Sequence, residues 1–104
     1  MGAKKHMAMD IYESLKEKRG EILSVAAQHG ATKVRVFGSV ARGDAGLDSD
    51  VDLLVEFEPG ATLLRHAAFV RKLTNVIGRD VQVVSERALR PRIRDRIIQE
   101  AVPL

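Results

Sequence analysis

The stretch "VFGSVARGDAGLDSDVDLLVEF", residues 36–57, joins two apolar segments through small and acidic residues. Gly38 and Ser39 close the first segment, and Asp50 and Asp52 stand at the start of the second. Carboxylates seldom lie in a buried strand without a partner. The pattern therefore predicts a strand whose two faces differ, one packed in the core and one directed at a ligand.

Hydrophobic periodicity along the rest of the chain predicts three helices and three strands. The expected helices cover residues 9–30, 61–78 and 90–101, and the expected strands cover residues 32–38, 50–57 and 79–85. The order helix, strand, strand, helix, strand, helix is typical of an α/β (α+β) domain. We expect a small mixed β-sheet with helices packed on one face. The apolar stripes of the second and third helices are Leu64, Ala68, Val70, Leu73 and Ile77, then Ile93, Ile97, Ile98 and Ala101.

Length and composition favour one small intracellular domain. A chain of 104 residues has the size of one domain, and we expect a flexible tail over 1–9 and a single domain over 10–104. Cysteine is absent, which excludes disulfides and thiolate metal sites and fits a reducing cytoplasm. No apolar run approaches the ~20 residues that span a bilayer, so no membrane role is expected.

The formal charge is +3, from 17 Lys and Arg against 14 Asp and Glu. This excess is too small to indicate nucleic acid as a direct ligand. The Arg-rich segment 87–96 has two interpretations, either a solvated helix face or a surface for an acidic partner or an RNA-like substrate.

Three aspartates are expected on one face of the sheet. Side chains alternate along a strand, so Asp50 and Asp52 point the same way, and Asp80 shares a face with Gln82 on the third strand. Two carboxylates roughly 6.6 Å apart repel by about 2.5 kcal/mol at an effective dielectric of ~20. A bound cation relieves that repulsion, and oxygen ligands favour Mg²⁺ or Mn²⁺.

The Gly-Ser turn supplies a phosphate site beside this acidic face. Gly38 lets the backbone approach a ligand closely, and Ser39 offers a hydroxyl. A nucleoside triphosphate would place its β- and γ-phosphates on Gly38–Ser39 and its α-phosphate at the metals. Two metals held by aspartates would activate an attacking hydroxyl and stabilise the leaving pyrophosphate.

The segments "GSVARG", residues 38–43, and "DSDVDLLV", residues 48–55, resemble the signature of the polymerase-β-like nucleotidyltransferase superfamily. Within it the chain is similar to the minimal nucleotidyltransferases over roughly residues 10–104. The resemblance implies that Gly38 and Ser39 hold the triphosphate and that Asp50 and Asp52 bind Mg²⁺. It assigns the third carboxylate to Asp80, as a base or a metal ligand. Arg42, from the same signature, either contacts phosphates or braces the loop.

Larger members of the superfamily add a domain that holds the acceptor, and this sequence has no residues left for one. We therefore expect another molecule to bring the acceptor, most simply a partner protein. The resemblance implies a small helical HEPN-type ribonuclease toxin as that partner, with AMP transferred from ATP to a tyrosine of the toxin. The chain would then be an antitoxin that acts by AMPylation. Two alternatives stay open: a non-catalytic antitoxin that neutralises by binding, and a nucleotidyltransferase that modifies RNA or a small molecule.

Overall fold

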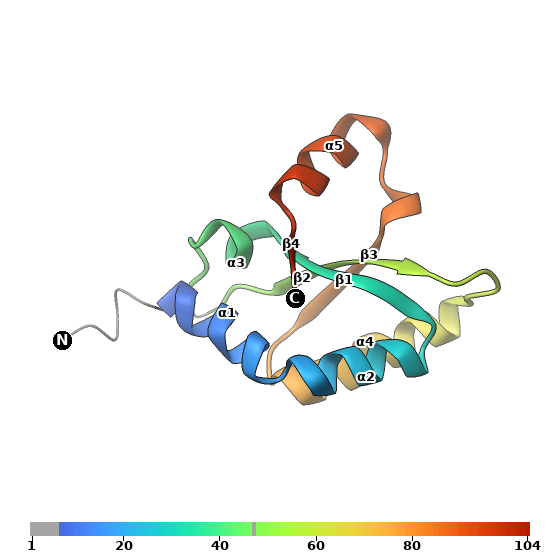
Figure 1. The fold of residues 1–104 in the computed structure, drawn as a ribbon, viewed down its shortest axis with the longest axis horizontal. Coiled ribbons are helices and arrows are strands. Elements are labelled where there is room, and N and C mark those ends of the chain that lie inside the picture. Colours follow the sequence, from blue (N-terminus) through green and yellow to red (C-terminus); the bar gives the residue numbers. More distant parts are fainter. Residues whose placement is uncertain (1–6, 47) are drawn as a thin grey trace.

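The computed structural model describes residues 7–46 and 48–104. Within them the elements are α1 (Met7–Glu17), α2 (Arg19–Gln28), β1 (Ala31–Phe37), α3 (Gly38–Arg42), β2 (Val51–Phe57), α4 (Leu63–Ile77), β3 (Val81–Ser85), the 3₁₀ helix η2 (Glu86–Ala88), α5 (Pro91–Glu100) and β4 (Val102–Pro103). The sheet has the order β3-β2-β1-β4 (Figure 1). β1 is antiparallel to β2 and β4, and β2 is parallel to β3. The predicted mixed α/β fold is therefore confirmed.

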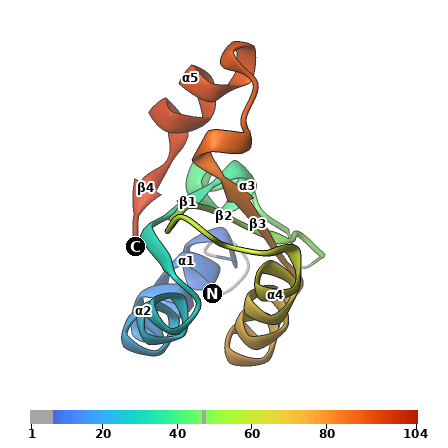
Figure 2. The same ribbon diagram turned by 90° about the vertical axis from the view of Figure 1, so that its right-hand side faces the viewer.

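The sheet separates two layers of unequal size. Helices α1, α2 and α4 cover one face, whereas α5 stands over the opposite face (Figures 1 and 2). The core lies on the side of α1, α2 and α4. Val51, Leu53 and Val55 are fully buried in it, as the alternation along β2 predicted. The other face of β2 carries Asp52 and the fully buried Leu54, and it faces the site and α5 (Figure 1).

The first helical segment differs from the prediction of one helix over 9–30. It is two helices that meet at Lys18, whose backbone N–H is shared between the carbonyl oxygens of Ser14 and Leu15, both at 3.1 Å. Gly20, the second residue of α2, is a poor helix former and lies next to this break. The helix also begins at Met7. Of the expected tail, residues 1–6 lie outside the described residues.

Two predicted apolar stripes are wrong in part. Leu64 is 84% exposed, because α4 turns the row Phe69, Leu73 and Ile77 to the core and Leu64 lies on the opposite side of the helix from Leu73. No residue of α5 is buried, since this helix stands away from the core layer. No helix in the described part of the chain is long and apolar enough to cross a bilayer.

A short strand after α5 was not predicted. β4 pairs with Arg35 and Val36 of β1, and the N–H of Leu104 donates to Val34 O at 3.2 Å. The segment that contains η2 and α5 therefore bridges from β3 at one sheet edge to β4 at the other. The first half of β1 is irregular, because a register shift lies between Thr32 and Arg35 and Lys33 has φ of 51°.

Candidate active site

The turn after β1 lies directly against the acidic strand β2. Phe37, the last residue of β1, is the register partner of Asp52. The next residue, Gly38, is buried and has φ of 74°, a conformation that favours glycine. A Cβ at Gly38 would overlap the Asp52 carboxylate. The structure therefore brings the Gly-Ser turn and the second aspartate of the D-x-D pair into contact.

Asp52 is the more buried of the two strand aspartates, since Asp50 is exposed. Burial, followed by the negative charge of Asp50, raises the pKa of Asp52 above its ordinary value; Arg42 opposes this shift and Glu100 adds to it. The ionised form of Asp52 is thus disfavoured where it stands. A hard divalent cation would relieve both the desolvation and the repulsion, so this pair of carboxylates fits Mg²⁺.

The third predicted carboxylate lies closer to Asp50 than to Asp52. In the parallel pairing of β2 and β3, Val51 is opposite Val81, and Val51 N–H donates to Asp80 O at 2.9 Å. One step earlier in the same register, Asp80 falls beside Asp50, and one step later Gln82 pairs with Asp52.

Asp50 and Asp80 line one open hollow of about 330 Å³, together with Asp48, Ser49, Gly78 and Arg79. Among residues 7–46 and 48–104, however, no group of three or more His, Cys, Asp or Glu side chains is arranged to hold one metal ion. The structure therefore pairs Asp80 with Asp50 and does not gather all three predicted aspartates around one point.

Arg42 braces the loop that follows Gly38. Its Nη1 lies 3.2 Å from Glu100 Oε2, and its Nε donates to Asp44 Oδ2 at 3.3 Å. Hydrogen bonds to these two carboxylates raise the pKa of Arg42 further above its usual value. The guanidinium is half exposed and lies at the mouth of the site, so phosphate contact remains a prediction.

Sequence reasoning missed Glu100. This last residue of α5 accepts a hydrogen bond from Gly38 N–H at 2.8 Å as well as from Arg42. The contact spans 62 residues, and its only local signal is an acidic side chain at the end of an Arg-rich helix.

Ser39, the other predicted phosphate ligand, is half-buried in the first turn of α3, and its carbonyl oxygen accepts from Asp44 N–H at 3.0 Å.

A larger hollow of about 530 Å³ lies at the opposite end of β2, between the loop before α4 and η2. None of the predicted site residues lines it. The candidate site is therefore the group formed by the Gly38–Ser39 turn, Asp50 just before β2, Asp52 in β2, and Asp80.

Comparison with known proteins identifies relatives along nearly the whole chain. A protein of Methanocaldococcus jannaschii, MJ0435, provisionally named a protein adenylyltransferase, is 35% identical over 89 residues, which are 86% of this chain and 96% of that protein. The protein adenylyltransferase MntA of Thermococcus cleftensis is 37% identical over 73 residues, which are 70% of this chain and 74% of that protein.

Two solved structures share the fold. One, described provisionally as a minimal nucleotidyltransferase, superposes with a TM-score of 0.81 at 54% identity and covers 88% of this chain and 94% of its own. The other, a toxin-antitoxin structure with AMP-PNP, has a TM-score of 0.70 at 17% identity, covers 81% of this chain and 69% of its own, and shows the fold alone.

The family model described as the nucleotidyltransferase domain matches residues 12–104. The chain therefore belongs to the nucleotidyltransferase domain family, as its Gly-Ser and D-x-D motifs predicted.

Proposed function

We propose that this chain is a Mg²⁺-dependent adenylyltransferase that transfers AMP from ATP to a tyrosine hydroxyl of a HEPN-type partner toxin, and so acts as its antitoxin. The observation that carries the proposal is the contact between Gly38 and Asp52. It sets a backbone turn suited to phosphate beside a carboxylate whose pKa is raised, so that bound nucleotide and bound cation would lie next to each other.

Each site residue has a role in this reaction. Gly38 and Ser39 hold the β- and γ-phosphates, and Asp50 and Asp52 hold Mg²⁺, which supplies charge neutralisation at the phosphates. The tyrosine oxygen forms a bond to the α-phosphorus while the bond from that phosphorus to the bridging oxygen breaks and pyrophosphate leaves. Asp80, beside Asp50, takes the hydroxyl proton in this scheme or ligates the cation nearest the attacking oxygen.

The names of the relatives support a protein acceptor. MJ0435 and MntA are both named as protein adenylyltransferases, and the structural neighbour with AMP-PNP is a toxin-antitoxin assembly. The site is also open, since Asp50 and Asp80 are both exposed, and a hydroxyl carried by another protein could reach it. The HEPN identity and the tyrosine rest on the family resemblance of the Gly-Ser and D-x-D motifs.

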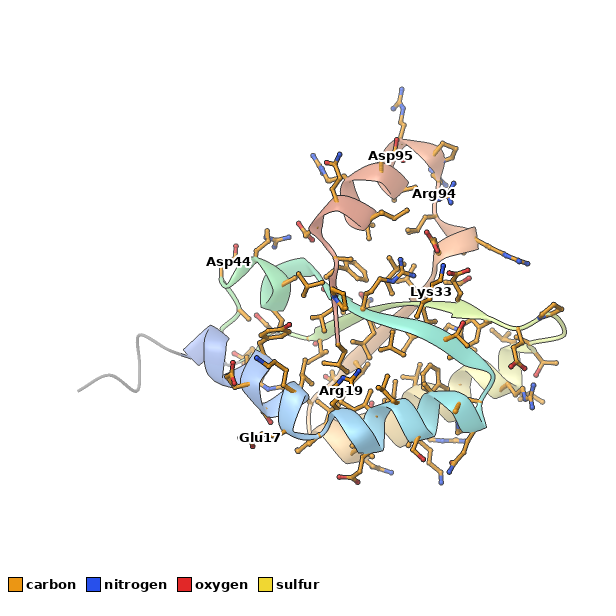
Figure 3. All side chains as sticks on the ribbon, viewed as in Figure 1. Glu17, Arg19, Lys33, Asp44, Arg94 and Asp95 are labelled. Atoms are coloured by element: carbon orange, nitrogen blue, oxygen red, sulfur yellow. The ribbon has the colours of Figure 1, made fainter. Side chains whose placement is uncertain are left out.

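The test is transfer of label from [α-³²P]ATP to the purified partner toxin, with Asp52→Asn as the variant. We expect wild-type protein with Mg²⁺ to label the toxin and Asp52→Asn to lower the rate at least 1,000-fold while the far-ultraviolet circular dichroism stays unchanged. Asp95→Asn, an exposed aspartate on α5 (Figure 3), is the matched control and should label at the wild-type rate. Undiminished labelling by Asp52→Asn would refute the catalytic assignment.

The same assay separates the two rival functions. An antitoxin that acts only by binding would neutralise the toxin equally well without ATP and Mg²⁺, and no modified peptide would be found by mass spectrometry. A transferase that acts on RNA would leave the toxin unlabelled and would label an added RNA instead.

A further inference from the structure

The Glu100 carboxylate occupies the donor groups that a phosphate would use. Its Oε1 accepts from Gly38 N–H at 2.8 Å, and both of its oxygens lie within 3.4 Å of Arg42 Nη1. Gly38 is the residue proposed to hold the triphosphate, and Arg42 is the cation at the mouth of that turn. An anionic side chain of the chain itself is therefore seated on the proposed anion site.

A second observation concerns the helix that carries Glu100. No residue of α5 is buried, and Ile93 is 43% exposed. Besides the contacts of Glu100, α5 makes an ion pair from Arg94 Nη2 to Glu86 Oε1 of η2 at 3.9 Å, and its Ile97 and Ile98 are half-buried. The Glu100 side chain is only 22% exposed. The C-terminal end of α5 is thus held by the contacts of Glu100 and by the pairing of β4, which follows it, with β1.

We propose that Glu100 is an internal competitor for nucleotide: its carboxylate holds Gly38 N–H and Arg42 until the triphosphate displaces it, so that the end of α5 moves when ATP binds. This inference rests on the proposed function, because it takes Gly38 as a phosphate ligand. A backbone N–H makes one strong hydrogen bond, and two anions on the same donor repel each other at close range. ATP and the Glu100 carboxylate therefore exclude each other.

The topology limits how far the segment that carries Glu100 can move. The segment from η2 to β4 is attached to the sheet at both ends, through β3 and through the pairing of β4 with β1. Release of Glu100 would consequently let α5 move away from the site, while β4 stays paired with β1 and keeps the end of the chain attached. This segment carries the exposed arginines Arg90, Arg92 and Arg96. The basic surface that they form would therefore move when nucleotide binds.

The test compares wild-type protein, Glu100→Gln and Glu100→Ala in two measurements on the full chain. In nucleotide-free protein, hydrogen exchange should show a protected Gly38 amide in wild type, and exchange at least tenfold faster in Glu100→Ala. With Mg²⁺ and AMP-PNP, isothermal titration calorimetry should give binding about tenfold tighter for both variants than for wild type. Wild-type protein must release Glu100 before it binds nucleotide, which weakens its apparent affinity, whereas the two variants do not carry this cost.

Glu58→Gln is the control, because it removes the same charge at the far end of β2 from an exposed side chain. It should leave both measurements at the wild-type values. If wild-type protein binds AMP-PNP and both Glu100→Gln and Glu100→Ala bind it equally well or more weakly, the inference is wrong. The proposed function would still stand. Absence of AMP-PNP binding by every protein would overturn the proposed function and the inference with it.

Discussion

Gly38 lies against the carboxylate of Asp52: a Cβ built on Gly38 would overlap Asp52 Oδ2 and lie 3.1 Å from Asp52 Cγ. The contact joins the two halves of the sequence motif, which are separated by the α3 segment and the loop before β2. This close approach is possible only because residue 38 has no side chain.

Replacement of Gly38 by alanine should therefore damage both stability and nucleotide binding. The backbone at this position has φ of 74°, which costs an L-residue roughly 1–2 kcal/mol, and the overlap with Asp52 adds to that cost. We expect Gly38→Ala to lower the free energy of unfolding by about 2 kcal/mol or more and to abolish AMP-PNP binding. Urea unfolding and calorimetry measure the two effects.

Gly43→Ala is the matched control for that variant. Gly43 also has a positive φ, 83°, but a Cβ there meets nothing within 4 Å. We expect a loss of about 1 kcal/mol from backbone strain alone and unchanged nucleotide binding. Equal effects of the two substitutions would show that the contact with Asp52 has no consequence.

The raised pKa of Asp52 predicts that this residue destabilises the protein at neutral pH when no cation is bound. Because the folded-state pKa exceeds the ordinary 3.8, the folded protein binds the proton more tightly than the unfolded chain. The ionised carboxylate therefore lowers the free energy of unfolding at pH 7, and this penalty disappears as the pH falls through the folded pKa. Asp52→Asn should raise the unfolding temperature at pH 7 in EDTA and give no increase at pH 3.

Addition of Mg²⁺ tests whether the charge of Asp52 destabilises the folded protein. The cation should raise the unfolding temperature of the wild-type protein and should have little effect on Asp52→Asn, which lacks the charge. A lower unfolding temperature of Asp52→Asn in EDTA at pH 7 would contradict the electrostatic account of this site.

Asp80→Asn tests the third predicted carboxylate. Asp80 is exposed and lies beside Asp50, so its replacement should change the free energy of unfolding by less than about 0.5 kcal/mol. Loss of a general base or metal ligand should lower kcat for AMP transfer at least 100-fold. Asp48→Asn, in the same hollow, should stay within twofold of wild type. Activity of Asp80→Asn equal to that of Asp48→Asn would remove Asp80 from the site.

Gly20→Ala should stabilise the protein. Gly20 lies in α2 with exposed surroundings, and a Cβ there meets nothing within 4 Å. Alanine removes the conformational freedom of glycine in the unfolded chain and should add roughly 0.5–1 kcal/mol to the free energy of unfolding. Chemical denaturation of the two proteins at equal pH measures the difference, and a loss of stability would mean that the bend at Lys18 needs a glycine nearby.

Local pattern was sufficient to predict β1, β2 and β3 of the sheet that carries the site. The alternation in β2 predicted that Val51, Leu53 and Val55 are buried and that Asp52 faces the other way, and the structure confirms both. The direction of side chains on a strand has a period of two residues, which is readable over a short segment. Leu54, on the face of Asp52, is also fully buried, and that burial was not predicted.

What could not be predicted depends on contacts between distant segments. β4 has only two residues, one of them Pro103, and gains its strand character from pairing with β1. Glu100 reaches Gly38 because that pairing brings the end of α5 over the sheet, a geometry with no local signal. The stripe of α4 was wrong at Leu64, because nine residues are about two and a half helical turns and place Leu64 opposite the buried Leu73.

The irregular first half of β1 has a consequence for self-association. β4 pairs with Arg35 and Val36, which leaves the N-terminal part of β1 without a neighbouring strand on that side. An exposed flat edge invites strand addition and aggregation. Lys33, with φ of 51° at the register shift, makes this edge irregular, and its ammonium group pairs with Glu56 Oε2 of β2 at 2.9 Å. We expect this irregularity to disfavour strand pairing between a second molecule and the edge that the short β4 leaves open.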